Sequence, residues 1–276
     1  MIKLDREPKR DGPKPILAVL NRSNHDRELN ALVAANNRTR FKRDIVVAST
    51  VLDDRHPWDE KTSDLSQYAC IWAGGSSDID MTHSTPLLTQ FFFRMEPVVE
   101  QADNQGIPIF AECFSHQGIT VMRGGKVVRD ETRWEGGTVL LHLTEEGRRH
   151  PLFEGLPDKV RILSLHKDSI SQAPPDQRTT VLAWSEGNPA YPGSEGNPYA
   201  VITTDTYTGI QQHTLYTPET IAPVFAETNK RIIQGAQLEP FPQTHPFGPI
   251  DDCESITVNF FNALPVEKNI FVPTLV

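Results

Sequence analysis

Short apolar runs alternate with amphipathic or polar stretches along the N-terminal third of the chain, in the order expected of βαβ units. Residues 15–21, 44–50 and 68–75 predict three strands, and residues 26–36 predict a helix between the first two. That order implies an α/β fold built on a mainly parallel open sheet with helices on both faces. The third run is apolar enough to be buried on both faces, and Gly74 and Gly75 close it. We therefore expect the third strand to end at a ligand-binding edge of the sheet.

The rest of the chain adds a long helix and a second group of strands. Residues 85–104 carry apolar side chains at helical spacing, and a strand is predicted at 107–111. Further strands are predicted at 138–143, 160–165, 180–184, 199–204 and 208–212, and a last helix at 255–264. Because turns join the first four of these strands, we expect a small antiparallel extension of the sheet.

Two segments rich in glycine or proline interrupt this order. The sequence SEGNP occurs at 185–189 and again at 194–198, and its composition predicts a surface loop. Residues 239–249 are rich in proline and predict a link to the last helix. Neither segment marks a convincing domain boundary, so we expect a single domain over residues 1–276.

Charge and composition argue against two classes of partner. The formal net charge is -9, with acidic residues scattered along the chain and no basic stripe that could neutralise a phosphate backbone, so nucleic acid is a poor candidate. No apolar run approaches the ~20 residues that cross a bilayer, and the first ten residues lack the apolar stretch of a secretory signal. We expect a cytoplasmic protein with no membrane partner.

The cysteines and histidines indicate neither a disulfide framework nor a metal site. Cys70, Cys113 and Cys253 are odd in number and widely spaced, and no two cysteines form a CxxC pair. The nine histidines are dispersed, without the i, i+4 spacing of a helical metal site. We expect no metal and no cofactor, and each cysteine must be judged singly.

Cys113 stands where the strand at 107–111 turns sharply into the next segment. A nucleophile on such a turn is held in a strained conformation and needs small neighbours two residues to either side, here Ala111 and Ser115. The N-terminus of the following helix favours a thiolate, and its N–H groups can stabilise an oxyanion. A lone cysteine at a strand end is also commonly a small buried side chain. The turn alone leaves both interpretations open.

An ordered set of motifs resembles the class I glutamine amidotransferases. Residues 111–117 (AECFSHQ) are similar to that family's nucleophile elbow, usually G-x-C-x-G-H-Q. Further matching segments follow in the family's order at 124–127, 135–136, 143–147, 151–157, 166–168, 181–183 and 209–213. The resemblance spans roughly residues 68 to 265 and is to glutaminase domains of the GMP synthase type, here free-standing. It implies a flavodoxin-like fold with Cys113 as nucleophile.

The resemblance also implies a base. The family places its catalytic histidine in a G-x-Q-x-H-P-E motif, and residues 209–213 match the first part, which assigns the base to His213. Thr214-Leu215 stands where Pro-Glu is expected, so the carboxylate that orients the imidazole is absent from its usual place. Glu219 could be the third member if the turn is wider; it also suits the first turn of a helix. His245 is a fallback base with no strand before it.

Other family positions are carried over in the same way. The oxyanion donors would be the N–H groups of Gly75 and Phe114, and Gly74 and Gln117 match positions near the glutamine pocket. Residues 135–137 match that pocket less closely. His166 and Asp168 match an H-x-D strand motif, for which a structural role is at least as suitable as a substrate contact.

One further departure is Glu112, which stands where the family usually has an apolar residue. A buried and ionised carboxylate beside the nucleophile would oppose thiolate formation. Either Glu112 points away into a polar contact, or it recognises something that the ordinary glutamine pocket does not.

The leading hypothesis is an enzyme that cleaves glutamine through a thioester on Cys113 and delivers ammonia to a separate synthetase subunit. Equally compatible with the sequence is a γ-glutamyl hydrolase or peptidase that acts alone on a γ-glutamyl small molecule. A third hypothesis, from another class, is a non-catalytic binding or regulatory module on the same fold. The altered elbow and the missing acid support that hypothesis, whereas retention of both Cys113 and His213 opposes it.

Overall fold

The computed structural model describes residues 12–21, 26–50, 58, 62–76, 81–129, 135–175, 178–186, 195–223, 226 and 250–265. The predicted proline-rich link at 239–249, with His245, lies outside these residues, as does most of the loop that carries the repeated SEGNP.

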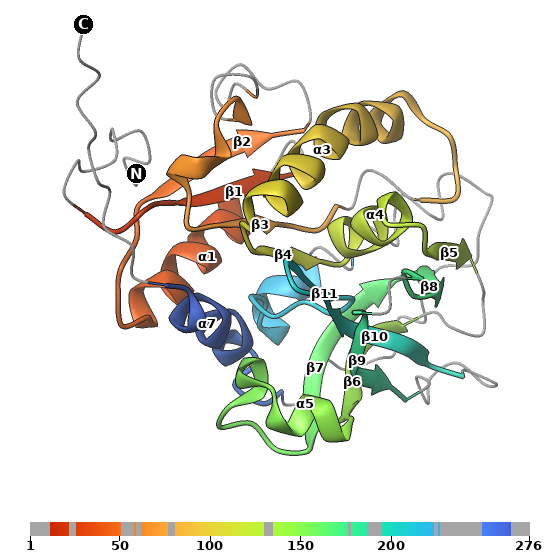
Figure 1. Ribbon diagram of the computed structural model, residues 1–276. Helices are drawn as coiled ribbons and strands as arrows, with labels where there is room; N and C mark the ends of the chain where they lie inside the picture. The colour runs from red at the N-terminus through yellow and green to blue at the C-terminus, as the bar shows by residue number, and fades with distance from the viewer. Residues whose placement is uncertain are drawn as a thin grey trace, which may run out of the picture.

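Five parallel strands form one half of a nine-stranded sheet (Figure 1). In spatial order they are β2 (Ile45–Ser49), β1 (Ile16–Leu20), β3 (Cys70–Ala73), β4 (Ile109–Glu112) and β11 (Tyr207–Ile210). All four neighbouring pairs run parallel. Their carboxyl ends therefore meet at one edge, the edge where open α/β sheets bind ligands.

Four antiparallel strands continue the sheet beyond β11. They are β10 (Asn197–Thr203), β9 (Thr180–Ser185), β6 (Glu135–Leu143) and β7 (Lys159–His166). A separate two-stranded sheet pairs β5 (Lys126–Arg129) with β8 (Asp168–Gln172). The predicted fold class is confirmed, and the antiparallel part is a full half-sheet. Strands β5 and β8, which are largely polar, were not predicted from the sequence.

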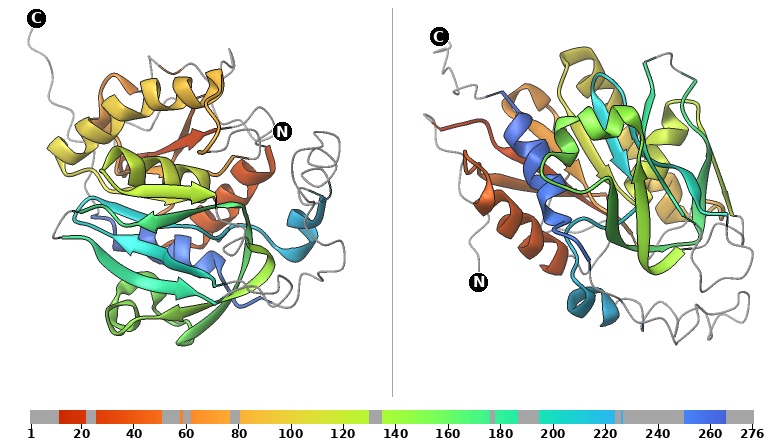
Figure 2. Two further views of the ribbon diagram at one scale, coloured as in Figure 1. Left: turned by 90° about the vertical axis from the view of Figure 1, so that its right-hand side faces the viewer. Right: turned by 90° about the horizontal axis from the view of Figure 1, so that it is seen from below.

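Helices cover both faces of the parallel half. Helices α3 (Pro86–Gln105) and α4 (Phe114–Met122) lie above the sheet in Figure 1, and α1 (Asp26–Arg38) and α7 (Glu254–Ala263) lie below it. Figure 2 shows α1 and α7 side by side from below. Shorter elements are α5 (Glu145–Arg149), the 3-10 turns Leu65–Gln67 and Pro151–Phe153, and a helical turn at 218–223.

Strand β1 shows how the two faces are filled. All five of its residues are fully buried, so the strand lacks the polar alternation of a half-exposed one. Its side chains nevertheless alternate between two separate cores: Ile16 belongs to the core that contains α1 and α7, and Leu17 to the core that contains α3 and α4. Because both faces are covered, the open carboxyl edge of the sheet is where polar side chains gather.

Packing from α3 fixes the start of α4. The ring of Phe91 contacts the ring of Phe114, the first residue of α4, with centroids 4.6 Å apart in an edge-to-face arrangement. A side chain at Gly118 would begin 2.4 Å from the Phe91 ring, so only glycine admits this contact. Phe91 therefore holds α4 close beneath α3, with the N-terminus of α4 at the open edge.

Candidate active site

Cys113 joins β4 to α4 in a strained conformation. Its φ is 48° and its ψ is -110°, and it is the one residue besides glycine that has a positive φ among those the structure describes. A non-glycine residue adopts such a backbone only when its surroundings impose it, as at a nucleophile elbow. The neighbours two residues away, Ala111 and Ser115, are both fully buried. The elbow geometry expected from the sequence is thus present.

Hydrogen bonds tie the elbow to the neighbouring strand ends. Ser115 Oγ donates to the carbonyl of Gly74 at 2.7 Å, and Asn21 Nδ2 donates to both Ser115 Oγ and that carbonyl at 2.7 Å. Cys113 N–H donates to the carbonyl of Ile210 at the end of β11. The ends of β1, β3, β4 and β11 are therefore joined around Cys113, and Ser115 is needed for its hydroxyl as well as its size.

His213 and Cys113 meet across Gly75. A Cβ built on Gly75 would lie 3.5 Å from His213 Cε1, 3.4 Å from Cys113 Cβ and 4.0 Å from Cys113 Sγ. The imidazole and the thiol therefore share one small space, which a side chain at position 75 would enter. His213 is anchored there by its own N–H, which donates to the carbonyl of Leu163 on β7, and by an edge contact with Tyr216.

The thiol of Cys113 is a weak acid in this structure. Burial raises its pKa to about 12, the N–H of Phe114 opposes that rise, and the nearby carboxylates of Glu112, Glu28 and Asp168 add to it. Cys113 is only 5% exposed. Little thiolate is therefore present at neutral pH, and a nucleophilic role for this sulfur would require a base to take its proton.

The two expected oxyanion donors have different partners in the structure. Phe114 N–H points to the sulfur of Cys113. Gly75 N–H donates to Glu28 Oε1 at 3.1 Å, and Glu28, in the first turn of α1, is 1% exposed. Gly74 offers its carbonyl to Asn21 and Ser115. For Gly75 to stabilise an oxyanion, the substrate oxygen must replace the Glu28 carboxylate at this N–H.

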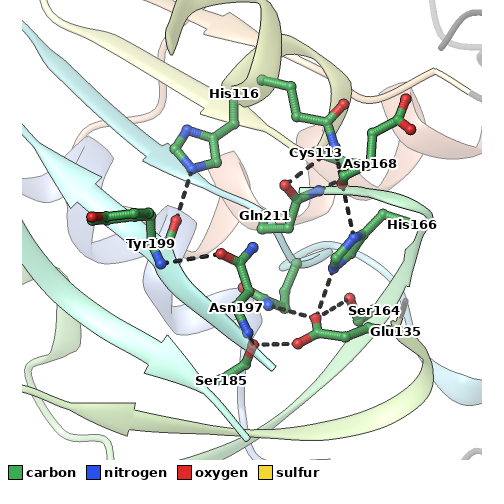
Figure 3. Close-up of polar contacts among 12 residues, drawn as sticks. Cys113, His116, Glu135, Ser164, His166, Asp168, Ser185, Asn197, Tyr199 and Gln211 are labelled. Atoms are coloured by element: carbon green, nitrogen blue, oxygen red, sulfur yellow. Dashed lines mark hydrogen bonds and ion pairs between the residues drawn. The ribbon is translucent and has the colours of Figure 1, made fainter. Parts of the chain in front are cut away.

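Two glutamines connect Cys113 to a buried polar network, and Figure 3 shows one of them, Gln211, beside Cys113. Gln211 Nε2 lies 3.8 Å from Cys113 Sγ, and Gln211 Oε1 accepts from Gln117 Nε2 at 3.2 Å. Gln117 Nε2 also donates to the carbonyl of Asp168 at 2.6 Å. Gln117 and Gln211 are almost fully buried. Gln117, expected near the substrate, is therefore fixed by hydrogen bonds close to the nucleophile.

Glu135 and His166 form a buried pair farther along this network. Figure 3 shows them facing each other, with His166 Nε2 2.8 Å from Glu135 Oε2. Ser164, Ser185 and Gln212 also donate to the Glu135 carboxylate. Burial alone would raise the pKa of Glu135, but His166 and the serine hydroxyls outweigh it and lower the pKa. This saturated pair ties β6 to β7, β9 and the end of β11, which is the structural role considered for His166.

Asp168 also has a full set of partners. Its carboxylate accepts from Arg129 Nε at 2.7 Å and from the N–H of Met81 at 2.9 Å, and it is 4% exposed. Its carbonyl accepts from Gln117 and lies 3.0 Å from His166 Nδ1. The H-x-D motif therefore connects the small sheet of β5 and β8 to the region around Cys113.

Steric crowding explains why the 209–213 motif begins with a glycine. A Cβ on Gly209 would lie 1.9 Å from His116 Nδ1 and 2.2 Å from the hydroxyl of Tyr207. His116 and Tyr207 are hydrogen-bonded to each other and fully buried, and burial lowers the pKa of His116 to about 3. A neutral His116 from the elbow thus packs directly on β11, so the two motifs are complementary in space.

Glu219 lies at the protein surface. It is exposed in the helical turn at 218–223, and a hydrogen bond with Thr217 lowers its pKa. Two residues near Cys113, Glu28 and Gln211, were not among the candidates predicted from the sequence. In the sequence, Glu28 is an ordinary acidic residue in the first turn of a helix. Gln211 is part of the motif at 209–213, which by itself assigns it no role.

Two negative findings concern the described part of the chain. Within it, no helix is both long and apolar enough to cross a membrane. The same residues contain no group of three or more His, Cys, Asp or Glu side chains arranged to hold a metal ion.

Two solved structures share the fold over almost the whole chain. A glutamine amidotransferase from Methylobacillus flagellatus matches with a TM-score of 0.64 and 14% identity, covering 92% of this chain and 97% of that one. A glutamine amidotransferase from Thermotoga maritima matches with a TM-score of 0.62 and 14% identity, covering 90% and 96%. At such low identity these likenesses show the fold alone.

Sequence comparisons identify the family. One subunit of the glutamine-hydrolyzing GMP synthase of Pyrococcus abyssi is 37% identical over 94 residues, 34% of this chain and 47% of that protein. The GMP synthase of Thermosipho melanesiensis is 28% identical over 162 residues, 57% of this chain and 26% of that protein. The matches thus span about half or less of these relatives. A family model described as glutamine amidotransferase class-I matches residues 57–221, and the chain belongs to that family.

Proposed function

We propose that the protein is a cysteine-dependent glutaminase that cleaves a γ-glutamyl amide through a thioester on Cys113. The observation that carries the proposal is the shared space of Cys113 and His213 beside Gly75, with Cys113 held at a φ of 48°. Strained backbone at a strand-to-helix turn serves to present a nucleophile. A buried structural cysteine would not require it.

In the first step, the sulfur of Cys113 attacks the γ-carbonyl carbon while His213 takes the thiol proton. The oxyanion that forms is stabilised by the N–H groups of Phe114 and Gly75. When this intermediate collapses, the carbon–nitrogen bond breaks, and the nitrogen leaves as ammonia with the proton that His213 returns. The glutamyl group remains on Cys113 as a thioester.

In the second step, water attacks the thioester. His213 accepts a proton from the water as the new carbon–oxygen bond forms. The carbon–sulfur bond then breaks, the proton returns to the sulfur, and glutamate is released. The thiol and the imidazole are restored to their starting states, so the reaction consumes one water and one glutamine for each ammonia released.

The base in this proposal works in a Cys113-His213 dyad. Glu219 is exposed, and the hydrogen bond that lowers its pKa is with Thr217. One relative is a separate subunit of a GMP synthase, which supports a second part of the proposal: the ammonia passes to another chain that carries the synthetase activity.

The test is labelling of the protein with a glutamine-like diazo-ketone. We expect rapid modification on the peptide that contains Cys113, prevented by glutamine and by Cys113→Ala. Cys70→Ala is the matched control, because Cys70 is equally buried but lies inside β3, and it should leave labelling unchanged. Slow labelling that glutamine does not prevent would contradict the proposal.

One observation favours a second candidate, a non-catalytic module on the same fold. Gly75 N–H already donates to the Glu28 carboxylate, and Glu28 is among the causes that raise the pKa of Cys113. Such an arrangement suits a protein that no longer stabilises an oxyanion. Labelling at the rate of an unactivated thiol would favour this candidate. Release of ammonia from glutamine, or of amine from a γ-glutamyl amide, would exclude it and would also identify the substrate class.

A further inference from the structure

The residues that flank the dyad are joined by a buried hydrogen bond. Glu112 directly precedes Cys113, and Thr214 directly follows His213. Thr214 Oγ1 donates to Glu112 Oε1, and both residues are almost fully buried, at 1% and 0% exposed. Glu112 and Thr214 are 102 residues apart, and each departs from the family's motif. In space, these two departures form one contact.

Together with two main-chain hydrogen bonds, this contact surrounds Cys113 and His213; we call these bonds the frame. Main-chain bonds already hold Cys113 to Ile210 and His213 to Leu163. Glu112 lies opposite Ile210 in the register of β4 and β11, so the bond from Thr214 joins the end of β4 to the turn that carries His213.

A third side chain completes the frame. The hydroxyls of Thr214 and Thr257, on α7, are 2.6 Å apart. Since Thr214 gives its proton to Glu112, it accepts from Thr257. The chain from α7 to β4 therefore runs Thr257 to Thr214 to Glu112, and it fixes the backbone on which His213 stands.

We propose that Glu112 and Thr214 are a positioning pair whose hydrogen bond holds His213 over Cys113, a task that an adjacent carboxylate performs in an ordinary triad. The inference rests on the proposed function and adds the device that orients its base. Neither residue touches the reacting atoms. Their effect is on the placement of the imidazole, on which proton transfer depends.

The charge of Glu112 gives the pair a pH signature. Burial raises the pKa of Glu112 to about 8, the bond from Thr214 opposes this, and Glu28 on α1 adds to it. Its Oε2 has no hydrogen-bond partner among the described residues, so no hydrogen bond there stabilises a negative charge on this oxygen. The titratable groups that interact with Glu112 are Glu28 and Cys113. Near pH 7, Glu112 is therefore neutral, and above pH 8 its charge opposes loss of the thiol proton.

The experiment follows the rate of Cys113 labelling by the glutamine-like diazo-ketone in the full chain, as a function of reagent concentration and pH. Thr214→Val removes the donor and keeps the shape. We expect the maximal labelling rate to fall about tenfold, the equivalent of one neutral hydrogen bond, with little change in the concentration for half-maximal rate. Thr214→Ser, which keeps the hydroxyl, should restore most of the rate.

Glu112→Gln keeps the acceptor and cannot ionise. For the parent we expect the labelling rate to fall above pH 8, whereas Glu112→Gln should label at near the parent rate at pH 7 and show no such fall. Thr208→Val is the control for loss of a buried hydroxyl away from this pair: Thr208 lies on β11, its hydroxyl bonds to that of Thr203, and the change should alter neither the rate nor the pH profile.

The inference is overturned if folded Thr214→Val labels within twofold of the parent, or if Glu112→Gln keeps the alkaline fall. It is also overturned if Thr214→Ser is as slow as Thr214→Val, since the hydroxyl would then not matter. These results differ from failure of the proposed function, in which the parent protein itself is not labelled rapidly at Cys113.

Discussion

At the scale of single residues, the acidity of Cys113 is controlled by carboxylates that the structure gathers around it. Glu28, Glu112 and Asp168 all raise the pKa of the thiol, after burial itself. Glu28 has a second effect, because it accepts the N–H of Gly75 that an oxyanion would need. In the proposed mechanism, the Glu28 side chain would thus oppose both the formation of the thiolate and the stabilisation of the intermediate.

Glu28→Gln should therefore lower the pKa of Cys113 and speed its alkylation by a small electrophile such as iodoacetamide. The amide keeps an oxygen for Gly75 and removes the charge. The measurement is the rate of alkylation between pH 7 and 10, where we expect a several-fold increase at pH 8. Glu96→Gln removes an equal charge from the exposed face of α3 and should have no effect. Superimposable profiles for Glu28→Gln and the parent would refute this account of the thiol.

Glu219→Gln should leave turnover unchanged and lower the melting temperature slightly at pH 7. Glu219 is exposed, and its pKa is lowered by the hydrogen bond with Thr217. A lowered pKa contributes stability above the unfolded value and loses it as the pH falls through the folded value. The difference in melting temperature should therefore vanish in acid. A marked loss of turnover in a folded variant would instead make Glu219 the third member of a triad.

At the scale of elements, the site depends on two neighbouring parallel strands that end together. Strand β4 ends at Glu112 and β11 at Ile210, paired in register, so the turns that follow bring Cys113 and His213 to one edge. Helix α7 seals this junction from below through Thr257. The frame around the dyad therefore contains a buried carboxyl, Glu112, whose ionisation the fold resists.

Stability should consequently depend on pH through Glu112. Its pKa is raised from an ordinary value of 4.5 to about 8, so the folded protein binds the proton more tightly than the unfolded chain. The free energy of unfolding should fall as the pH rises between these two values, and Glu112→Gln should remove this part of the fall. The free energies of unfolding of the parent and of Glu112→Gln are measured with urea at pH 6 and at pH 9. We expect the variant to gain stability relative to the parent at pH 9, by about 1–3 kcal/mol. If the difference in free energy of unfolding between variant and parent is equal at pH 6 and pH 9, Glu112 is not buried in a protonated state.

At the scale of the whole molecule, the sequence predicts most of the sheet because short apolar runs mark most of its strands. The strand expected at 15–21 is β1 at Ile16–Leu20, and the helix expected at 85–104 is α3 at Pro86–Gln105. Strands β5 and β8 were missed because they lack the apolar run that marks the other short strands: β5 (KVVR) has no buried residue, and β8 (DSISQ) has a single apolar one, Ile170.

The candidate site was predictable only in part. Cys113 and His213 lie in motifs, the family resemblance singled out both, and the structure brings both beside Gly75. The contact of Glu28 with Gly75 spans 47 residues and that of Glu112 with Thr214 spans 102, and nothing in the local sequence marks either pair. Glu112 and Thr214 could be noted as departures from a pattern, but only the three-dimensional structure shows that they meet.

The most direct test of the account is to trap the covalent intermediate. The protein is mixed with glutamine, quenched in acid and digested, and the peptides are measured by mass spectrometry. The account predicts a glutamyl group on the peptide that contains Cys113, absent from Cys113→Ala and accumulated in variants that slow the hydrolysis step. Ammonia release from glutamine that persists in Cys113→Ala, or a glutamyl adduct at another residue, would contradict it.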